Sequence, residues 1–212
     1  MPESNFGHFL LRAVGLQLVL LGLWWTVLYW PSIGLLRLTA EVPFTFLLTN
    51  PSKSTLEVDS STGEWNFSIP VNALVKDSTQ SNDPVSVDEI EFAAPPENVA
   101  PFTTGWFVYM GLALSVPITR NSISRTIKGL FSQTAISALA LFTYAEVNAR
   151  GTLAHMHRVP DPLGLWFLAF VYYIDYLVIP YASPFLLILW THPEWWPKLI
   201  GSPGGFRTTM SK

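Results

Sequence analysis

The sequence predicts an integral membrane protein, mainly α-helical, with a four-helix transmembrane bundle and a small β-containing extracytoplasmic insertion between the first and second helices. Half of the 212 residues are apolar and only 13% are charged, about half the charged fraction of an ordinary soluble domain. The charges are crowded between long uncharged stretches. Each stretch approaches or exceeds the roughly 20 residues that a helix needs to cross the bilayer core.

Four uncharged stretches define the expected spans. They are Val14–Leu36, Val99–Thr119, Gly129–Ala145 and Pro162–Thr191, the last interrupted only by Asp175. Inside lipid the backbone must satisfy its own hydrogen bonds, so these stretches should be helical. With their flanks, the expected transmembrane helices cover residues 9–36, 99–118, 129–149 and 163–191.

Two further features bear on these helices. The apolar core of the first exceeds the 7–15 residues of a cleaved signal peptide, so we expect an uncleaved anchor. Pro180 and Pro184 interrupt the fourth. Because proline removes a helical hydrogen bond, we expect a kink there.

Basic residues in the short link 119–128 set the expected orientation. Arg120, Arg125 and Lys128 lie in it without any acidic residue, and short basic loops stay in the cytoplasm. Both termini, including the tail 192–212, are therefore assigned to the cytoplasm, and the loop 150–162 to the outside. The three link cations are also candidates for contact with anionic lipid headgroups.

The outer segment 37–98 is strongly acidic, with ten acidic residues against three basic ones. Apolar and polar residues alternate near 55–59, 65–71 and 85–92, which predicts two or three short strands. Pro70 suggests that the second strand lies at an edge. So few strands are marginal alone, and we expect them to pack on the membrane surface or on a partner. The acidic excess is either a solvated face or a docking surface for a basic partner segment.

Asp175 is the first candidate for intramembrane chemistry. It lies about 12 residues into the fourth span, which is ~18 Å at the helical rise and near the midplane. A carboxylate there costs several kcal/mol unless it is paired, protonated or hydrated. Tyr172 and Tyr176 could form a hydroxyl network with it, and Gln17 and Gln133 on other spans could also reach it. Asp175 is therefore expected either to form a structural hydrogen bond between helices or to have a functional role, such as proton handling or substrate contact.

Glu146 is a second candidate polar residue, near the outer end of the third span. Its spacing of four from Arg150 also fits an ordinary helical ion pair.

Metal and cofactor chemistry have little support. The chain has no cysteine, which excludes thiolate nucleophiles and ligands. His155, His157 and Asp161 are weak metal candidates, because an H-x-H pair alone does not specify zinc. No cofactor is predicted, and a net charge of −3 offers no basic surface for nucleic acid.

Three segments carry a resemblance to a family. They are Phe9–Arg12, Phe102–Ser115 followed by Pro117, and Tyr173–Trp190 with its Pro-x-x-x-Pro. In these the chain resembles the exosortase H-associated membrane proteins. The resemblance covers the helices and the layout, while the acidic segment matches nothing specific in that family.

The resemblance implies a bacterial inner-membrane accessory to an envelope protein-sorting system, beside a transpeptidase-like membrane enzyme. That enzyme family works through Cys, Arg and His, so a chain without cysteine should not be the enzyme itself. The leading hypothesis is a non-enzymatic accessory or scaffold protein. The alternative is an intramembrane enzyme or small transporter that uses Asp175 with Glu146 or with His155 and His157.

Overall fold

The computed structural model describes residues 3–47, 55–59, 61–76, 84–115, 120–157 and 162–193. In chain order the elements are α1 (Glu3–Leu23), a π-helical turn η1 (Trp24–Leu28), α2 (Tyr29–Leu47), β1 (Thr55–Val58), β2 (Trp65–Lys76), β3 (Pro84–Ala94), α3 (Pro96–Ser115), α4 (Arg120–His157), α5 (Pro162–Tyr173), a second π-helical turn η2 (Ile174–Val178) and α6 (Ile179–Thr191). The mainly helical class and the small sheet are therefore confirmed.

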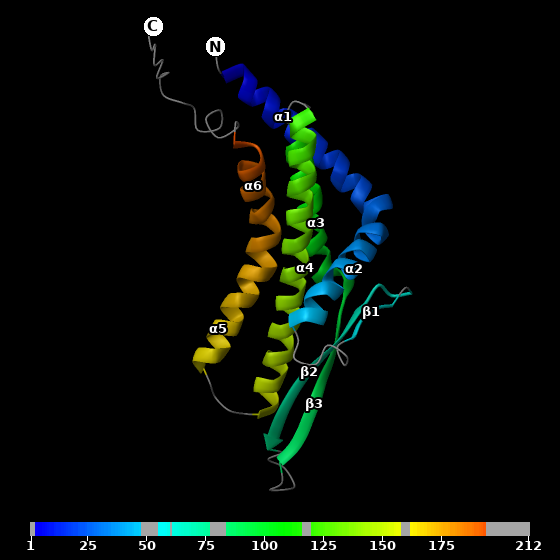
Figure 1. The fold of residues 1–212 in the computed structure, drawn as a ribbon, viewed down its shortest axis with the longest axis vertical. Helices are drawn as coiled ribbons and strands as arrows, with labels where there is room; N and C mark the ends of the chain where they lie inside the picture. Colours follow the sequence, from blue (N-terminus) through cyan, green and yellow to red (C-terminus); the bar gives the residue numbers. More distant parts are fainter. Residues whose placement is uncertain are drawn as a thin grey trace.

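Three of the helical segments are long and apolar enough to cross a membrane. They are Leu11–Thr45, Asn121–Leu153 and Trp166–Thr191. The helix α3 lies at the centre of the bundle and contacts α1, α2, α4 and α6 (Figure 1). Half of its 20 residues are buried. A helix enclosed by other helices is shielded from lipid, so it needs less apolar surface than its neighbours.

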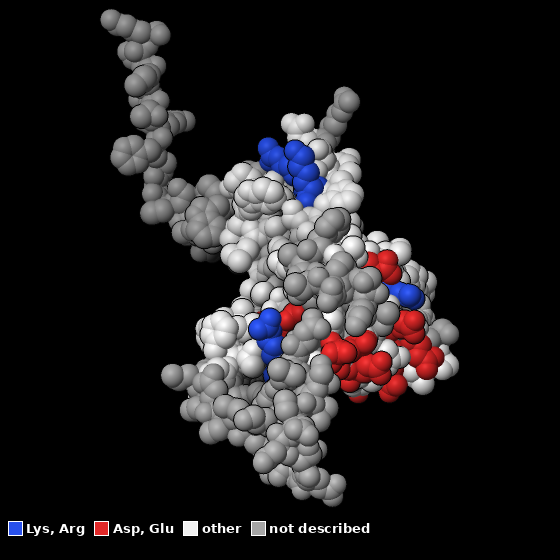
Figure 2. Space-filling model, turned by 60° about the horizontal axis from the view of Figure 1, so that its bottom comes forward, with Lys and Arg blue, Asp and Glu red and all other residues white. Residues whose placement is uncertain are grey.

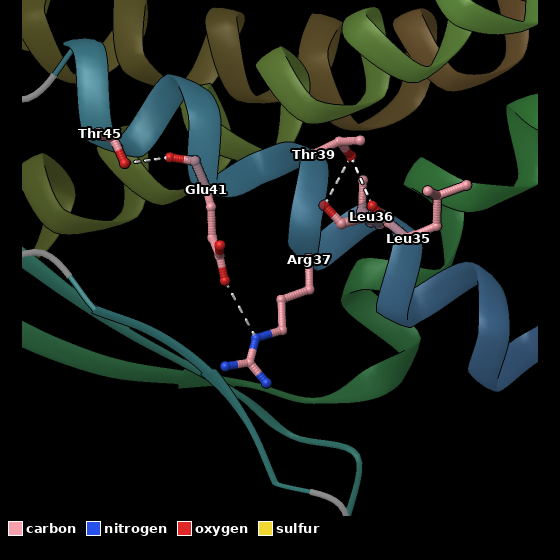
Figure 3. Close-up of polar contacts among 6 residues, drawn as sticks. All are labelled: Leu35, Leu36, Arg37, Thr39, Glu41 and Thr45. Carbon is pink, nitrogen blue, oxygen red and sulfur yellow. Dashed lines mark hydrogen bonds and ion pairs between the residues drawn. The ribbon is translucent and has the colours of Figure 1, made fainter.

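Two helices extend beyond the boundaries expected from charge. The first helical segment continues past residue 36 to Leu47. The helix α4 begins at Arg120, inside the expected link, and runs to His157, inside the expected loop 150–162. Charged residues continue the first helical segment past residue 36. Arg37 and Glu41 lie one turn apart there and form an ion pair, with 3.8 Å between the Arg37 Nε and Glu41 Oε1 atoms (Figure 3). Charge marks where a helix leaves the apolar core of a membrane and does not by itself end the helix.

Each of the two bent helical segments contains a π-helical turn ahead of a proline. Pro31 follows η1, and Pro180 follows η2. A proline ring clashes with the carbonyl four residues before it, which belongs to Val27 in one case and to Tyr176 in the other. Both carbonyls lie inside the wide turn. A π-turn relieves such a clash by shifting the hydrogen bond to the fifth residue, as the Ile179 N–H donates to the Ile174 carbonyl. The π-helical turn in the fourth expected span therefore includes Asp175.

The three strands form an antiparallel sheet in the order β1-β2-β3. Pro70 lies on the central strand β2, so its predicted edge position is wrong for the sheet as a whole. Among the described residues, the pairing with β1 runs from Val58 and Trp65 to Thr55 and Ser68 and does not include Pro70. The register with β3 also shifts just after this residue. A proline is tolerated where a ladder is already interrupted.

The sheet packs on the helices through an aromatic core, in the lower part of Figure 1. Phe67 on β2 is its hub, with ring contacts to Phe44 at the end of α2, at 6.2 Å, and to Tyr144 on α4, at 6.4 Å. Trp65 and Ile69 flank it on the same face and are almost fully buried. The bundle therefore supplies the surface that so small a sheet needs.

Candidate functional site

A buried polar cluster joins three helices inside the apolar part of the bundle. The Ser183 hydroxyl on α6 donates a hydrogen bond of 3.0 Å to the Gln133 Oε1 atom on α4. Gly105 on α3 lies against both the Gln133 amide and the Pro180 carbonyl. Because glycine carries no side chain, α3 can approach both helices closely here. From the sequence, Gln133 was expected to be able to reach Asp175. In the structure its Oε1 atom accepts the hydrogen bond from Ser183 instead.

Asp175 lies in the wide turn η2 and is only 3% exposed. Within the described part of the chain, its Oδ2 atom has no hydrogen-bond partner. Buried polar atoms are nearly always paired, so an unpaired one calls for an explanation. The Asp175 carboxyl group therefore either only fills space in the π-helical turn, or it has a chemical role that requires a bound ligand or proton donor.

The two tyrosines expected around Asp175 are engaged elsewhere. The Tyr172 and Tyr176 rings stack at 5.5 Å, and both contact the Tyr144 ring on α4. The Tyr176 hydroxyl donates a long bond of 3.5 Å to the Glu97 carbonyl at the start of α3. These rings tie α3, α4 and the α5–α6 segment together at the level of the sheet.

Glu146 forms the ion pair that its spacing predicts. Its Oε2 atom lies 3.0 Å from the Arg150 Nε atom. The Glu146 side chain is 19% exposed, so this acid is partnered and partly accessible. It therefore adds no free carboxylate to the Asp175 region.

The candidate metal ligands fall largely outside what the structure describes. His155 and His157 lie in the last turn of α4, their side chains are not described, and Asp161 lies outside the described residues. Across the described ranges, no group of three or more His, Cys, Asp or Glu side chains could hold a metal ion. The metal prediction stays untested.

A second polar network lies at the opposite end of the bundle, where α4 begins and α6 ends. The Tyr109 and Thr191 hydroxyls lie 3.2 Å apart, and Thr191 is 2.9 Å from the His192 Nδ1 atom. All three residues are buried. The Tyr109 hydroxyl also donates a long bond of 3.5 Å to the Arg125 carbonyl. This network was not predictable from the sequence, because Tyr109 lies on α3, far along the chain from Thr191 and His192, and no recognisable motif links them.

Two of the three expected headgroup contacts lie beside this network. Arg125 and Lys128 are exposed on α4, and together with Trp190, Thr191 and Pro193 they line a cavity of about 280 Å³. The Arg120 side chain is not described. The geometry offers positive charge and an indole at one rim of the bundle, a combination typical of a membrane interface.

The outward face of the sheet is acidic. Glu57 on β1 and Glu89 and Glu91 on β3 are exposed. Side chains alternate across a strand, and the register places all three on the face opposite Phe67. Figure 2 shows acidic side chains gathered at this end of the molecule and a group of basic ones at the other end, with smaller basic patches beside the acidic ones. We call Glu57, Glu89 and Glu91 the acidic sheet face.

A tight turn follows β1 at the margin of this face. The Ser61 hydroxyl and backbone N–H each donate a hydrogen bond of 2.7 Å to the Asp59 carboxylate. These bonds, the hydroxyl bond first, hold the pKa of Asp59 below its ordinary value. Gly63 completes the turn at a φ of 75°, which favours glycine because other residues are strained there.

Comparison with known proteins gives no relative for this chain. No protein-family profile matches it, and searches of curated proteins and of solved structures return no significant match. Function is therefore argued from the residues and their arrangement.

Proposed function

We propose that this chain is a non-enzymatic, multi-pass membrane protein that serves as an accessory or scaffold for an exosortase-type sorting enzyme of the bacterial inner membrane. The acidic sheet face would dock a basic segment of that enzyme outside the cytoplasm. The proposal combines the sequence resemblance with one structural observation: an acidic surface held rigidly on a membrane bundle.

The proposed topology has four spans with both termini in the cytoplasm. Three helical segments meet the length and composition of a span. The helix α3 runs antiparallel to α1, α2 and α4 and parallel to α6 (Figure 1). It has 20 residues, about the length that crosses the hydrocarbon core. Its burial supports treating it as the fourth span, since lipid does not surround it. The polar sheet then lies on one side and Arg125 with Lys128 on the other.

The proposal rests on the acidic sheet face, whose opposite side packs against the helical bundle. Its strands are anchored by Trp65, Phe67 and Ile69 on the inner face, so the carboxylates are presented without loss of backbone order. Complementary charge speeds association and suppresses wrong partners more than it adds raw affinity. A scaffold that must find one membrane partner has use for such a surface.

Co-purification from native membranes in mild detergent tests the proposal. We expect a sorting enzyme of the exosortase type to be recovered with the tagged full chain. Recovery of the chain without any envelope-sorting component would contradict the proposed role.

Asp175 supports a second candidate function, an intramembrane enzyme or small transporter. The observation in its favour is the buried Oδ2 atom without a described partner. Against it, Asp175 is not among the described residues that line three of the cavities, of about 530, 310 and 280 Å³. Asp175→Asn separates the two, since it keeps the shape and removes the acid. Both candidates predict that this variant still assembles and still recovers its partner. If the chain is a non-enzymatic scaffold, the variant also replaces the wild type in cells. If the acid has a chemical role, the variant does not replace the wild type in cells.

A further inference from the structure

We infer that the cavity between the start of α4 and the end of α6 is a binding site for the phosphate of an anionic membrane lipid headgroup. The site consists of Arg125 and Lys128 on α4 and of Trp190, Thr191 and Pro193 on or just after α6. This inference does not depend on a sorting partner. It assigns the lipid source and the pocket, beyond the general attraction of basic residues to a membrane.

The charge and shape of the cavity fit a phosphate. Arg125 and Lys128 are three residues apart on α4, so their side chains emerge from the same side of the helix. Arginine offers a planar fork of donors and lysine a compact charge, and both bind phosphate well. The cavity volume of about 280 Å³ lies near the lower end of small-ligand sites. Among the described residues that line the cavity, none is acidic.

The floor of the cavity is held in place by the buried polar network. Tyr109 on α3 lies against Gly129 on α4, so the turn carrying Lys128 sits close to α3. The Tyr109 hydroxyl reaches both Thr191 and the Arg125 carbonyl. These contacts fix α4 and α6 relative to each other, which lowers the ordering cost of binding.

The position favours a lipid over a soluble phosphate. The cavity lies at the end of two candidate spans, Asn121–Leu153 and Trp166–Thr191. Trp190 is 67% exposed, and an exposed indole next to cations at a span end is typical of the headgroup layer. A headgroup phosphate is held at this depth by the bilayer itself, whereas a free phosphate must come from solution.

Native mass spectrometry of the full chain in detergent tests the site. The probes are phosphatidylglycerol, zwitterionic phosphatidylcholine and inorganic phosphate. We expect phosphatidylglycerol adducts to exceed phosphatidylcholine adducts. Arg125→Gln and Lys128→Gln should each weaken phosphatidylglycerol binding about fivefold, from the typical contribution of one cation at the surface. Arg125→Lys, which keeps the charge, should retain most of it.

Arg12→Gln is the matched control, because Arg12 is exposed on α1 and lies outside the cavity lining. It removes the same charge and should weaken phosphatidylglycerol binding less than Arg125→Gln or Lys128→Gln does, because Arg12 contributes no direct contact in the cavity. Equal weakening by Arg12→Gln, or equal binding of the two lipids, would overturn the site. Inorganic phosphate that displaces phosphatidylglycerol at low millimolar concentration would overturn the lipid source.

Discussion

The Tyr109 phenol on α3 lies directly against Gly129 on α4, so that a Cβ atom at position 129 would overlap the Oη and Cζ atoms of the ring. Tyr109 is fully buried, and its hydroxyl is held at 3.2 Å from the Thr191 hydroxyl. Gly129→Ala should therefore destabilise the bundle by about 1–3 kcal/mol, the usual cost of overpacking. Thermal unfolding of the purified protein in detergent measures this effect.

Gly151→Ala is the control for that substitution, because it lies on the same helix and a Cβ there meets nothing within 4 Å. It should leave the unfolding temperature unchanged or raise it slightly, since alanine favours a helix. If the two variants unfold alike, the close approach of α3 and α4 at Gly129 is wrong.

The hydrogen bond between Ser183 and Gln133 should contribute measurably to the packing of α6 on α4. Interhelical hydrogen bonds in membranes average about 0.6 kcal/mol and reach about 1.7 kcal/mol. A double-mutant cycle with Ser183→Ala and Gln133→Leu should give a coupling free energy in this range. Among the described residues, the Thr143 hydroxyl donates to the Leu139 carbonyl of its own helix, so Thr143→Ala should show no coupling to Gln133→Leu. Comparable coupling for both pairs would argue against a specific bond.

The turn that follows β1 should depend on pH in the acidic range. Because the folded pKa of Asp59 is lowered, the folded turn binds the proton less tightly than the unfolded chain does. Its stabilisation is present above the ordinary carboxyl pKa of about 3.9 and is lost as pH falls through the lowered value. The amide NMR signal of Ser61 should shift with this titration. Asp59→Asn should abolish the shift, and its persistence in that variant would exclude the Asp59–Ser61 bonds as the cause.

The helices and the sheet could be predicted from the sequence because apolar length and strand alternation are local signals. The helix ends were less accessible, since Arg37 and Arg120 mark charge while the backbone remains helical around them. The central place of α3 also escaped prediction. Its burial depends on four other elements, and nothing within residues 96–115 shows that they surround it.

The candidate site was predictable only in its composition. Asp175 and Gln133 stand out as polar residues in apolar stretches, but which partner each meets depends on helix rotation. The π-turn η2 changes that rotation between Tyr173 and Ile179. The network of Tyr109, Thr191 and His192 depends on contacts between helices 82 positions apart along the chain. Only the Glu146–Arg150 pair, which is local, was predicted with its partner.

The four-span topology can be tested by single cysteines, because the chain contains none of its own. Asn66→Cys on the sheet and Ser124→Cys on α4 are both exposed positions. A membrane-impermeant maleimide should label Asn66→Cys in cells whose outer membrane is permeabilised, and Ser124→Cys only after the inner membrane is opened. Labelling of both cysteines from the same side would refute the proposed orientation.

The most direct test of the proposed scaffold role is capture of the sorting enzyme by charge variants of the acidic sheet face. Glu57, Glu89 and Glu91 are replaced together by glutamine, and Glu41→Gln serves as a control because Glu41 is an acid on α2 paired with Arg37. We expect the wild type and Glu41→Gln to recover an exosortase-type enzyme from native membranes. The triple variant should lose most of it at equal expression. Undiminished recovery by the triple variant would contradict docking on this face.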